Sequence, residues 1–322
     1  VLGKSLKKFL KIFVPIAVGL FLVWYSYSST TPEERKQIIH YISNASPFWV
    51  TLSVILGILS HISRAVRWNF LLEPMGYRPK IINNIFIVLI SYFANLGIPR
   101  SGEILRATAL TTYEKVPFEK GFGTIVTERV IDLLMLLLII IVTLLLQTDI
   151  ILAFLEEKGV NLIGAFGILF VGIAGLFIST AIIRKSKSAL AQKLKSFLNG
   201  LLDGVLSVFK MKKKWPFIFH TFFIWAAYIG MFWVIKHTVA ETLSLSLSEL
   251  LVAFVAGAFA MSTTNGGIGL YPIAVSAALG IFDINSVSGD AFGWIMWIAQ
   301  TLMVVVFGTI SFIVLPLLNR NR

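Results

Sequence analysis

Long apolar runs alternate with short polar stretches along this chain, and most of the runs are long enough to cross a lipid bilayer. The runs lie at residues 9–28, 48–72, 82–98, 123–147, 160–183, 217–239, 248–264, 268–282 and 290–315. Because a backbone inside lipid must satisfy its own hydrogen bonds, runs of this kind are predicted to be helices. The pattern therefore predicts an all-α polytopic membrane protein.

Composition supports this prediction and excludes several kinds of chemistry. Hydrophobic residues make up 57% of the chain and charged residues 14%, whereas a soluble domain is about half apolar and about a quarter charged. The chain has no Cys, which excludes disulfides, thiolate metal sites and thiol catalysis. Its four His are too scattered along the sequence to indicate a metal cluster. We therefore expect no metal and no other cofactor.

The distribution of basic residues predicts the orientation of the chain. Lys and Arg cluster before the first apolar run, at residues 184–214 and after the last run, and such loops stay in the cytoplasm. The acidic loops 29–47 and 148–159 are then outside. This places both termini in the cytoplasm and the protein in the inner (plasma) membrane. The formal charge of +12 is explained in the same way, so we expect no binding to nucleic acid.

Loop charges also predict two segments that enter and leave the membrane on one side. The run at 48–72 must end inside, and the run at 123–147 must start inside, so residues 82–114 begin and end in the cytoplasm. By the same reasoning residues 248–282 begin and end outside. The stretch "NLGIPRSGEILRATAL" (95–110) and the stretch "TTNGGIGLYP" (263–272) interrupt these segments with Gly and Pro, where helices break.

The order of the predicted elements indicates an internal repeat. Residues 1–147 and 160–315 each contain two helices, a re-entrant helical hairpin and another helix, and the second set has the opposite orientation. Six spanning helices and two oppositely oriented hairpins form an inverted-topology repeat, which many secondary transporters use to build a site at the membrane midplane. Asn95, Gly97 and Ile98 match Asn265, Gly267 and Ile268 at a constant spacing.

Residues 188–209 have helical spacing of apolar and charged side chains. They predict a cytoplasmic amphipathic linker helix that lies on the membrane and joins the two repeats within a single membrane domain. A solvated linker helix is the alternative.

Four stretches resemble the transmembrane, flippase-like region of the lysylphosphatidylglycerol synthases and their stand-alone relatives. They are "RAVRWNFLL" (64–72), "PRSGEILRATAL" (99–110), "TERVIDLL" (127–134) and "NGGIGLYP" (265–272). The resemblance spans nearly the whole chain. Because the synthases continue into a soluble aminoacyl-transfer domain that does not follow the last helix here, the resemblance implies lipid translocation and argues against lipid synthesis.

The two breaks are predicted to form an anion-binding site. Ser101 is expected to be the N-cap of the returning arm of the first hairpin, and the returning arm of the second is expected to start at 270–272. Helix N-termini that meet inside the membrane can bind a lipid phosphate with backbone N–H groups. Four residues of the second break are assigned to this site: Asn265, Gly266, Gly267 and Gly269. Close helix packing is the alternative explanation of the glycines.

Six charged residues fall in the first hairpin and the helix after it. They are Arg100, Glu103, Arg106, Glu128, Arg129 and Asp132. Each would cost about 2.5–3.5 kcal/mol at the bilayer centre if it faced lipid, so all must face protein or water. In one interpretation Arg100 and Arg106 bind phosphate. One of the carboxylates Glu128, Asp132 and Glu103 then exchanges for it or carries a coupling proton. In the other the charges only pair with one another, as the three-residue spacing of Glu103 with Arg106 and of Arg129 with Asp132 allows.

Arg64 and Arg67 share a helix face and are expected near the inner interface, about 24 Å along a core about 30 Å thick. Interfacial anchoring and recruitment of lipid head groups are both open for them. The eight Trp are expected mostly to mark the membrane interfaces.

These features lead to one function hypothesis and two rivals. We expect a flippase-like transporter of an anionic or aminoacylated phospholipid, or of a polyprenyl-phosphate lipid, with no catalytic residues. The rivals are an intramembrane enzyme and a scaffold in lipid or glycolipid biosynthesis; the chain has no HExxH, GxSxG or Walker motif. The expected partners are membrane lipids bound through their phosphate head groups. A homo-oligomer or a biosynthetic enzyme partner is left open.

Overall fold

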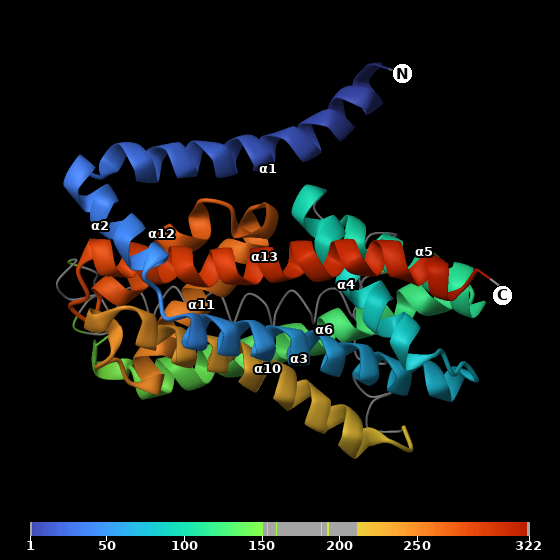
Figure 1. Ribbon diagram of the computed structural model, residues 1–322. Helices are drawn as coiled ribbons and strands as arrows, with labels where there is room; N and C mark the ends of the chain where they lie inside the picture. The colour runs from blue at the N-terminus through green and yellow to red at the C-terminus, as the bar shows by residue number, and fades with distance from the viewer. Residues whose placement is uncertain are drawn as a thin grey trace. The chain divides into compact units, whose positions relative to one another are not determined.

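The computed structural model is helical throughout the part of the chain that it describes, and no strand occurs there. It describes residues 2–98, 100–150 and 211–320, with four isolated positions between the last two ranges. The helices are α1 (Leu2–Ser29), α2 (Pro32–Ser43), α3 (Pro47–Leu72), α4 (Ile81–Gly97), α5 (Ser101–Glu114), α6 (Phe118–Leu146), α10 (Lys214–Ile235), α11 (Leu247–Thr263), α12 (Leu270–Gly280) and α13 (Ser286–Leu318) (Figure 1). The prediction of an all-α protein is confirmed.

Short 3₁₀ turns join some of these helices. They are η1 (Glu73–Met75), η2 (Lys236–Thr238), η3 (Ala240–Thr242) and η4 (Asn265–Gly267). The predicted membrane segment at 160–183 and the predicted linker helix at 188–209 lie outside the described residues. The chain divides into two compact units, one made of residues 1–128 with 215–322 and the other of residues 129–214.

Within the described residues, four helices are long and apolar enough to cross a membrane. They span Pro47–Met75, Phe118–Leu146, Lys214–Thr238 and Ser286–Leu318. Their lengths of 25 to 33 residues correspond to about 37–50 Å of helix, more than the bilayer core of about 30 Å. They coincide with four of the predicted crossings. The predicted first segment is also helical and forms part of α1.

Two pairs of shorter helices form hairpins in the first unit. The first hairpin consists of α4, with 17 residues, and α5, with 14. The second consists of α11, with 17 residues, and α12, with 11. At 1.5 Å per residue these helices are about 17–25 Å long, too short to cross the core singly. Both breaks fall in the stretches that the sequence marks with Gly and Pro.

The break of the first hairpin corrects the predicted cap. Ser101 is the first residue of α5, and its hydroxyl donates to the carbonyl oxygens of Ala94 and Ile98. Arg100 occupies the N-cap position with φ 60°. The oxygen that caps the helix comes from Asn95, whose Oδ1 accepts a hydrogen bond of 2.8 Å from the N–H of Gly102. The prediction that Ser101 is the cap is wrong because a side chain of the preceding helix satisfies this N–H.

The break of the second hairpin uses glycine for its backbone conformation. Gly266, Gly267 and Gly269 have φ of 58°, 76° and 71°, values that residues with a side chain rarely adopt. The side chain of Leu96 packs against Gly266, so the two breaks touch each other. The indole N–H of Trp297 on α13 donates to the carbonyl oxygen of Gly266 at 2.7 Å.

Helix α13 contacts both hairpins, each at a different height. Gly293 packs closely on Pro272 of the second hairpin: a Cβ added to Gly293 would lie 2.7 Å from the Cα of Pro272. Gly308 packs on Phe93 of the first hairpin: a Cβ added to Gly308 would lie 2.5 Å from the Cβ of Phe93. The second hairpin therefore lies along the N-terminal half of α13 and the first hairpin along its C-terminal half. Their breaks meet near the middle of α13.

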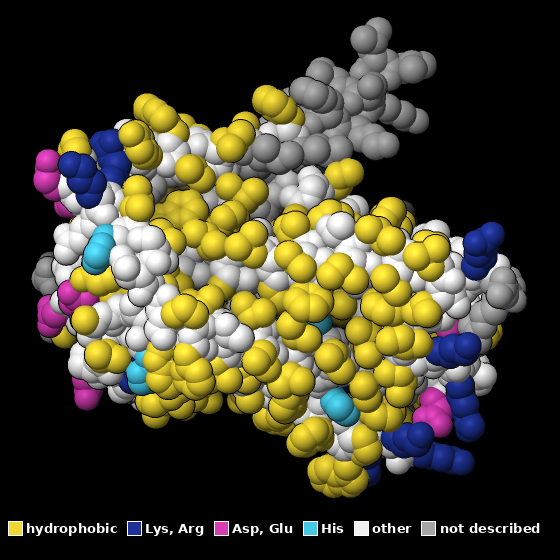
Figure 2. Space-filling view, viewed as in Figure 1, with side chains coloured by type: hydrophobic (Ala, Val, Ile, Leu, Met, Phe, Trp, Pro, Cys, Tyr) yellow, Lys and Arg dark blue, Asp and Glu magenta, His cyan; other side chains and the backbone are white. Residues whose placement is uncertain are grey.

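The open ends of the two hairpins lie at opposite ends of α13. Asn83, at the start of α4, exchanges two hydrogen bonds of 3.0 Å with Asn319, just after α13, and also donates to Glu114 at the end of α5. At the other end, Ser276 of α12 donates to the carbonyl oxygen of Ser286, where α13 begins. Lys and Arg gather at the end of this unit where α13 terminates (Figure 2).

Candidate functional site

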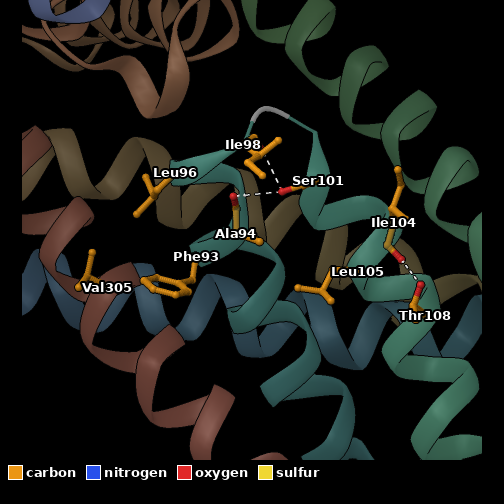
Figure 3. A pocket seen from close by; sticks show the side chains of 10 residues that line it. Phe93, Ala94, Leu96, Ile98, Ser101, Ile104, Leu105, Thr108 and Val305 are labelled. Atoms are coloured by element: carbon orange, nitrogen blue, oxygen red, sulfur yellow. Dashed lines mark hydrogen bonds between the residues drawn. The ribbon is translucent and has the colours of Figure 1, made fainter. Parts of the chain in front are cut away.

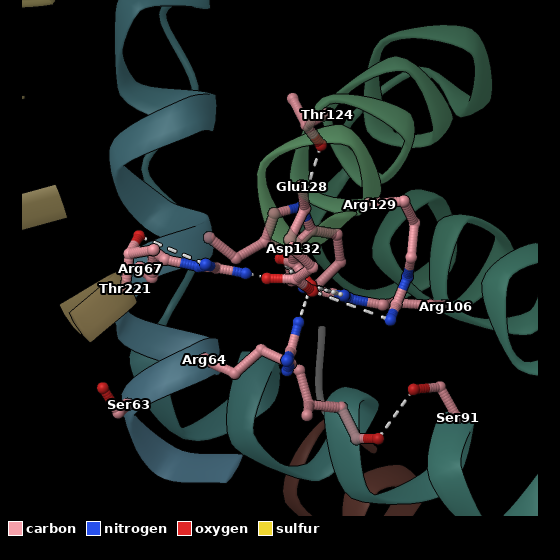
Figure 4. A network of polar contacts seen from close by, with 12 residues as sticks. Ser63, Arg64, Arg67, Ser91, Arg106, Thr124, Glu128, Arg129, Asp132 and Thr221 are labelled. Atoms are coloured by element: carbon pink, nitrogen blue, oxygen red, sulfur yellow. Dashed lines mark hydrogen bonds and ion pairs between the residues drawn. The ribbon is translucent and has the colours of Figure 1, made fainter. Parts of the chain in front are cut away.

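Three arginines from two helices converge on one buried carboxylate. Arg64 and Arg67 come from α3 and Arg106 from α5, and all point toward Glu128 of α6 (Figure 4). The exposed fractions of the four residues are 2%, 0%, 1% and 0%. We call these four residues the arginine–glutamate cluster. It joins α3, α5 and α6 in the interior of the first unit.

The distances define two strong ion pairs and one longer contact. Arg106 binds Glu128 with two parallel bonds, Nη1 to Oε1 at 2.9 Å and Nη2 to Oε2 at 3.0 Å. Arg64 donates to Oε1 at 2.7 Å, and Nη2 of Arg67 lies 3.7 Å from the same oxygen. Paired arginine and carboxylate groups of this geometry form charge-assisted hydrogen bonds with a fixed orientation.

Neighbouring side chains fix the orientation of the arginines. The guanidinium of Arg106 lies 3.8 Å from the centroid of the Trp68 ring, and the indole N–H of Trp68 donates to Thr124 at 2.8 Å. Arg67 donates to the hydroxyl of Thr221 on α10 at 3.2 Å. The cation–π contact and the hydrogen bonds leave little rotational freedom, so the cluster is preorganised.

Arg64 and Arg67 are not exposed anchors in the structure. Depth along one helix placed them near the inner interface, but their side chains turn into the protein and bind Glu128. Trp68 is fully buried as well, so it is not an interfacial residue. Burial with an opposite charge removes the need to reach water, because the carboxylate compensates for lost hydration.

An open groove lies beside the first break. Its volume is about 780 Å³, and its wall is almost entirely apolar. The residues that line it are Phe93, Ala94, Leu96, Gly97, Ile98, Ser101, Ile104, Leu105, Thr108 and Val305 (Figure 3). We call it the hairpin groove. Helix α5 therefore presents one face to the groove and carries Arg106 of the cluster, so a movement of α5 would change both.

The other predicted residues of the first hairpin lie in different surroundings. Arg100 is exposed, and it immediately precedes Ser101 of the groove wall. Glu103 is half-buried in the first turn of α5. Arg129 and Asp132 belong to the second unit, where Arg129 Nη1 lies 3.8 Å from Asp132 Oδ2.

The four residues of the second break are held in a close-packed region. Asn265 is 3% exposed, and its side-chain Nδ2 has no hydrogen-bond partner. A Cβ on Gly269 would lie 2.6 Å from the carbonyl oxygen of Gly19 in α1, and a Cβ on Gly267 would lie 2.7 Å from Met261 Sδ. Close approach to the backbone of α1 thus explains Gly269 in addition to its positive φ, whereas Gly267 is explained mainly by its positive φ.

Sequence reasoning missed several residues that build the site. Trp68, Thr124 and the groove residue Val305 were not selected, because nothing in their local pattern shows which face they occupy. Asn95 was noticed only as part of the repeat. Its position seven residues before Gly102, with a helix break between, is a signal that could have identified it as the cap. Among the described residues no group of three or more His, Asp or Glu could hold a metal ion.

Comparison with known proteins supports the resemblance seen in the sequence. The family model of the lysylphosphatidylglycerol synthase transmembrane region matches residues 12–308. A UPF0104 membrane protein of Methanocaldococcus jannaschii is 35% identical over 99 residues, which are 30% of this chain and 30% of that protein. Glycosyltransferase AglD of Haloferax volcanii is 29% identical over 123 residues, 38% of this chain and 20% of that protein.

A UPF0104 membrane protein of Methanothermobacter thermautotrophicus is 27% identical over 122 residues, 37% of this chain and 33% of that protein. The matched segments thus span a third or less of the length of these curated relatives. No solved structure matches the chain. Since the family model covers most of the sequence, this multi-pass membrane protein belongs to the lysylphosphatidylglycerol synthase transmembrane-region family.

Proposed function

We propose that this protein is a flippase-like transporter that moves a lipid with an anionic or aminoacylated phosphate head group, or a polyprenyl-phosphate lipid, across the inner membrane. The observation that carries the proposal is the meeting of two broken helical hairpins beside an open apolar groove. Broken helices that meet at midplane depth are the usual way in which a transporter places polar backbone groups inside lipid.

The proposed topology has six crossings, two opposed re-entrant hairpins and both termini in the cytoplasm. The tie between Asn83, Glu114 and Asn319 supports it, because it holds both ends of the first hairpin beside the end of α13. The two repeats would be residues 1–147 and 160–315 of one membrane domain. The contact between Leu96 and Gly266 then lies where the two repeats meet.

The hairpin groove fits the hydrocarbon part of such a lipid. It is open and apolar, and the exposed Arg100 directly precedes the groove residue Ser101. A lipid chain in the groove would place an anionic head group within reach of a long basic side chain. Helix α5 links this position to the arginine–glutamate cluster.

In the proposed mechanism the carboxylate of Glu128 occupies, inside the protein, the place that the phosphate of a lipid head group would take. Glu128 holds Arg64 and Arg106 in the described conformation. A phosphate offers the same bidentate geometry as a carboxylate, so it could replace Glu128 as the partner of one arginine when α5 moves. Glu103, on the same helix as Arg106, is a further charge that would respond to this movement.

Reconstitution in liposomes with fluorescent phosphatidylglycerol tests the proposal. Val305→Trp fills the groove, and Val306→Trp on the same helix is the matched control because Val306 does not line it. We expect translocation by the wild-type protein, a loss of at least about tenfold with Val305→Trp, equal to about 1.4 kcal/mol, and a near wild-type rate with Val306→Trp. Equal rates for both variants, or no translocation by the wild type, would contradict the proposal.

A second candidate is an enzyme or a membrane scaffold in lipid or glycolipid biosynthesis. It is favoured by the similarity to a protein named glycosyltransferase AglD. In the same liposomes, mass spectrometry of the lipids separates the two candidates. Translocation without chemical change supports transport, whereas a new lipid product supports the enzyme.

A further inference from the structure

A series of buried polar side chains follows α3 through the first unit. They are Ser53, Ser60, His61, Ser63, Arg64 and Arg67. At 1.5 Å per residue the series covers about 21 Å of a helix that is long enough to cross the membrane. Polar and ionisable side chains inside a membrane are costly, and they commonly mark paths for ions or protons. Only part of this series belongs to the arginine–glutamate cluster.

His61 is the titratable member of the series that the proposed mechanism does not use. It is 5% exposed, and its ring centroid lies 4.3 Å from that of Tyr92 on α4. Its Nδ1 is buried and has no hydrogen-bond partner. A buried imidazole nitrogen without a partner is an available position for a proton. Because burial disfavours the charged form, taking up that proton requires the surroundings to rearrange.

His61 is placed to influence the cluster. Arg64 follows it by three residues on α3, so the two side chains share one face of the helix. Arg64 also donates to Glu128 at 2.7 Å. Among the described residues, the titratable or charged groups that act on His61 are Arg64 and Tyr92. From α13, Gln300 and Met303 reach Gly57 one turn away, and neither titrates.

A proton on His61 would create a second cation beside Arg64. In a buried site the repulsion between like charges is weakly screened, so protonation favours a conformation in which Arg64 has moved away. The closed Arg64–Glu128 pair and a protonated His61 therefore oppose each other. A proton taken up from water on one side and returned to water on the other leaves the imidazole unchanged.

We propose that His61 is a proton-binding site and that its protonation opens the Arg64–Glu128 pair, so that proton movement and lipid movement are coupled. This proposal rests on the lipid translocation proposed above. It assigns the coupling proton to His61 and not to a carboxylate of the first hairpin or of α6.

The first test measures fluorescent phosphatidylglycerol translocation in liposomes with and without an imposed pH gradient. We expect the gradient to change the wild-type rate by at least about fivefold, the lower end of typical coupling between sites. His61→Gln should remove the response to the gradient. His220→Gln is the matched control, since His220 also lies in a membrane-crossing helix but its Nδ1 is bonded to Ser63 Oγ at 2.7 Å. It should keep the response. A full gradient response in His61→Gln would overturn the proposal.

The second test does not need translocation. The chain has four His, so ¹⁵N-histidine spectra in lipid nanodiscs are simple, and His61→Gln assigns the signal of His61. We expect Arg64→Gln to let His61 take up its proton at a pH higher by at least about one unit, a tenfold change in proton affinity. An unchanged titration would overturn the proposal even if lipid moves. A shifted titration with no lipid movement would instead reject the proposed function and retain His61 as a proton site linked to Arg64.

Discussion

Arg106 is held by both oxygens of Glu128 and by the ring of Trp68, and only 1% of it is exposed. The described conformation thus gives this side chain a structural role whatever it binds during transport. Without Arg106, Glu128 would keep Arg64 and Arg67 but lose its bidentate partner. Breaking a buried ion pair typically costs about 3–5 kcal/mol.

We therefore expect Arg106→Ala to lower the free energy of unfolding by about 3–5 kcal/mol, with Arg106→Lys in between because it keeps the charge and loses the planar fork. Thermal unfolding in detergent measures both. Arg100→Asn is the control: it removes an exposed charge from the same hairpin, and Asn tolerates the positive φ of this position. A stable Arg106→Ala protein would show that Glu128 does not depend on this arginine.

For Arg100, unlike Arg106, we expect an effect on transport and not on stability. Because it is exposed beside the hairpin groove, its loss should leave folding intact and weaken attraction for an anionic head group. A basic residue near anionic lipid contributes about 1 kcal/mol, so the translocation rate of phosphatidylglycerol should fall about fivefold in Arg100→Asn. A zwitterionic lipid analogue should be affected less. Equal effects on the two lipids would show that Arg100 does not recognise charge.

At the residue scale the sequence identified the charged residues but did not predict how Arg64 and Arg67 are paired. Intramembrane charge alone was enough to select Arg106 and Glu128, since such residues are rare in lipid-spanning segments. Arg64 and Arg67 were placed by counting residues along one helix. Counting gives depth but not the partner, and the partner lies on α6, 61 or more residues away in the chain.

The helical hairpins depend on contacts that no local pattern shows. A Cβ added to Gly102 would overlap the carbonyl oxygen of Ser91 on α4. We expect Gly102→Ala to destabilise the first hairpin by about 1–3 kcal/mol, the usual cost of overpacking. Gly97→Ala is the matched control, since a Cβ there meets nothing within 4 Å. Thermal unfolding of the two variants measures the difference, and equal melting temperatures would contradict the close packing of α4 and α5.

A hydrogen bond joins α2 to the turn before α11. The hydroxyl of Tyr41 donates to Oε1 of Glu241 at 2.7 Å. This bond lowers the pKa of Glu241 below its ordinary value of 4.5 and raises the pKa of Tyr41 above its ordinary value of 10. Its contribution is therefore present between those two values. It is lost as pH falls through the lowered pKa of Glu241, or rises through the raised pKa of Tyr41.

Both groups are largely exposed, so the expected contribution is only about 0.5 kcal/mol. Amide hydrogen exchange of α2 at pH 7 and pH 3, compared after correction for intrinsic exchange rates, measures it. Protection of α2 should decrease at pH 3 in the wild-type protein and should be lower at pH 7 in Tyr41→Phe, with little further change at pH 3. The same loss of protection on acidification in wild type and Tyr41→Phe would assign the effect to other groups.

The sequence predicted most described helices within a few residues, because apolar length and the Gly and Pro of the breaks are local signals. The start of α5 at Ser101 was predicted correctly and its cap was not. Ser101 has the residue type of a cap, but the N–H of Gly102 is satisfied by Asn95 from the preceding helix. A cap supplied across a break is a tertiary contact, so propensity does not reveal it.

For the whole molecule, loop charge predicted that two segments turn back. In the structure Asn83 binds Asn319 at one end of α13, and Ser276 bonds to Ser286 at the other. The re-entrant topology itself stays a prediction. The groove was beyond prediction. It is formed by the two arms of a hairpin and by Val305, about two hundred residues further along the chain. A groove between elements that are distant in sequence leaves no local pattern from which it could be predicted.

The central claim is that the two hairpins enter the membrane from opposite sides, and labelling of single cysteines in a chain that has none tests it most directly. We choose four exposed positions for the cysteines. Lys80 and Thr112 lie at the ends of the first hairpin, and Ser244 and Ser286 flank the second. In oriented membrane vesicles, cysteines at 80 and 112 should react with an impermeant maleimide only from the cytoplasmic side, and those at 244 and 286 only from outside. Reaction of either pair from opposite sides would contradict the account.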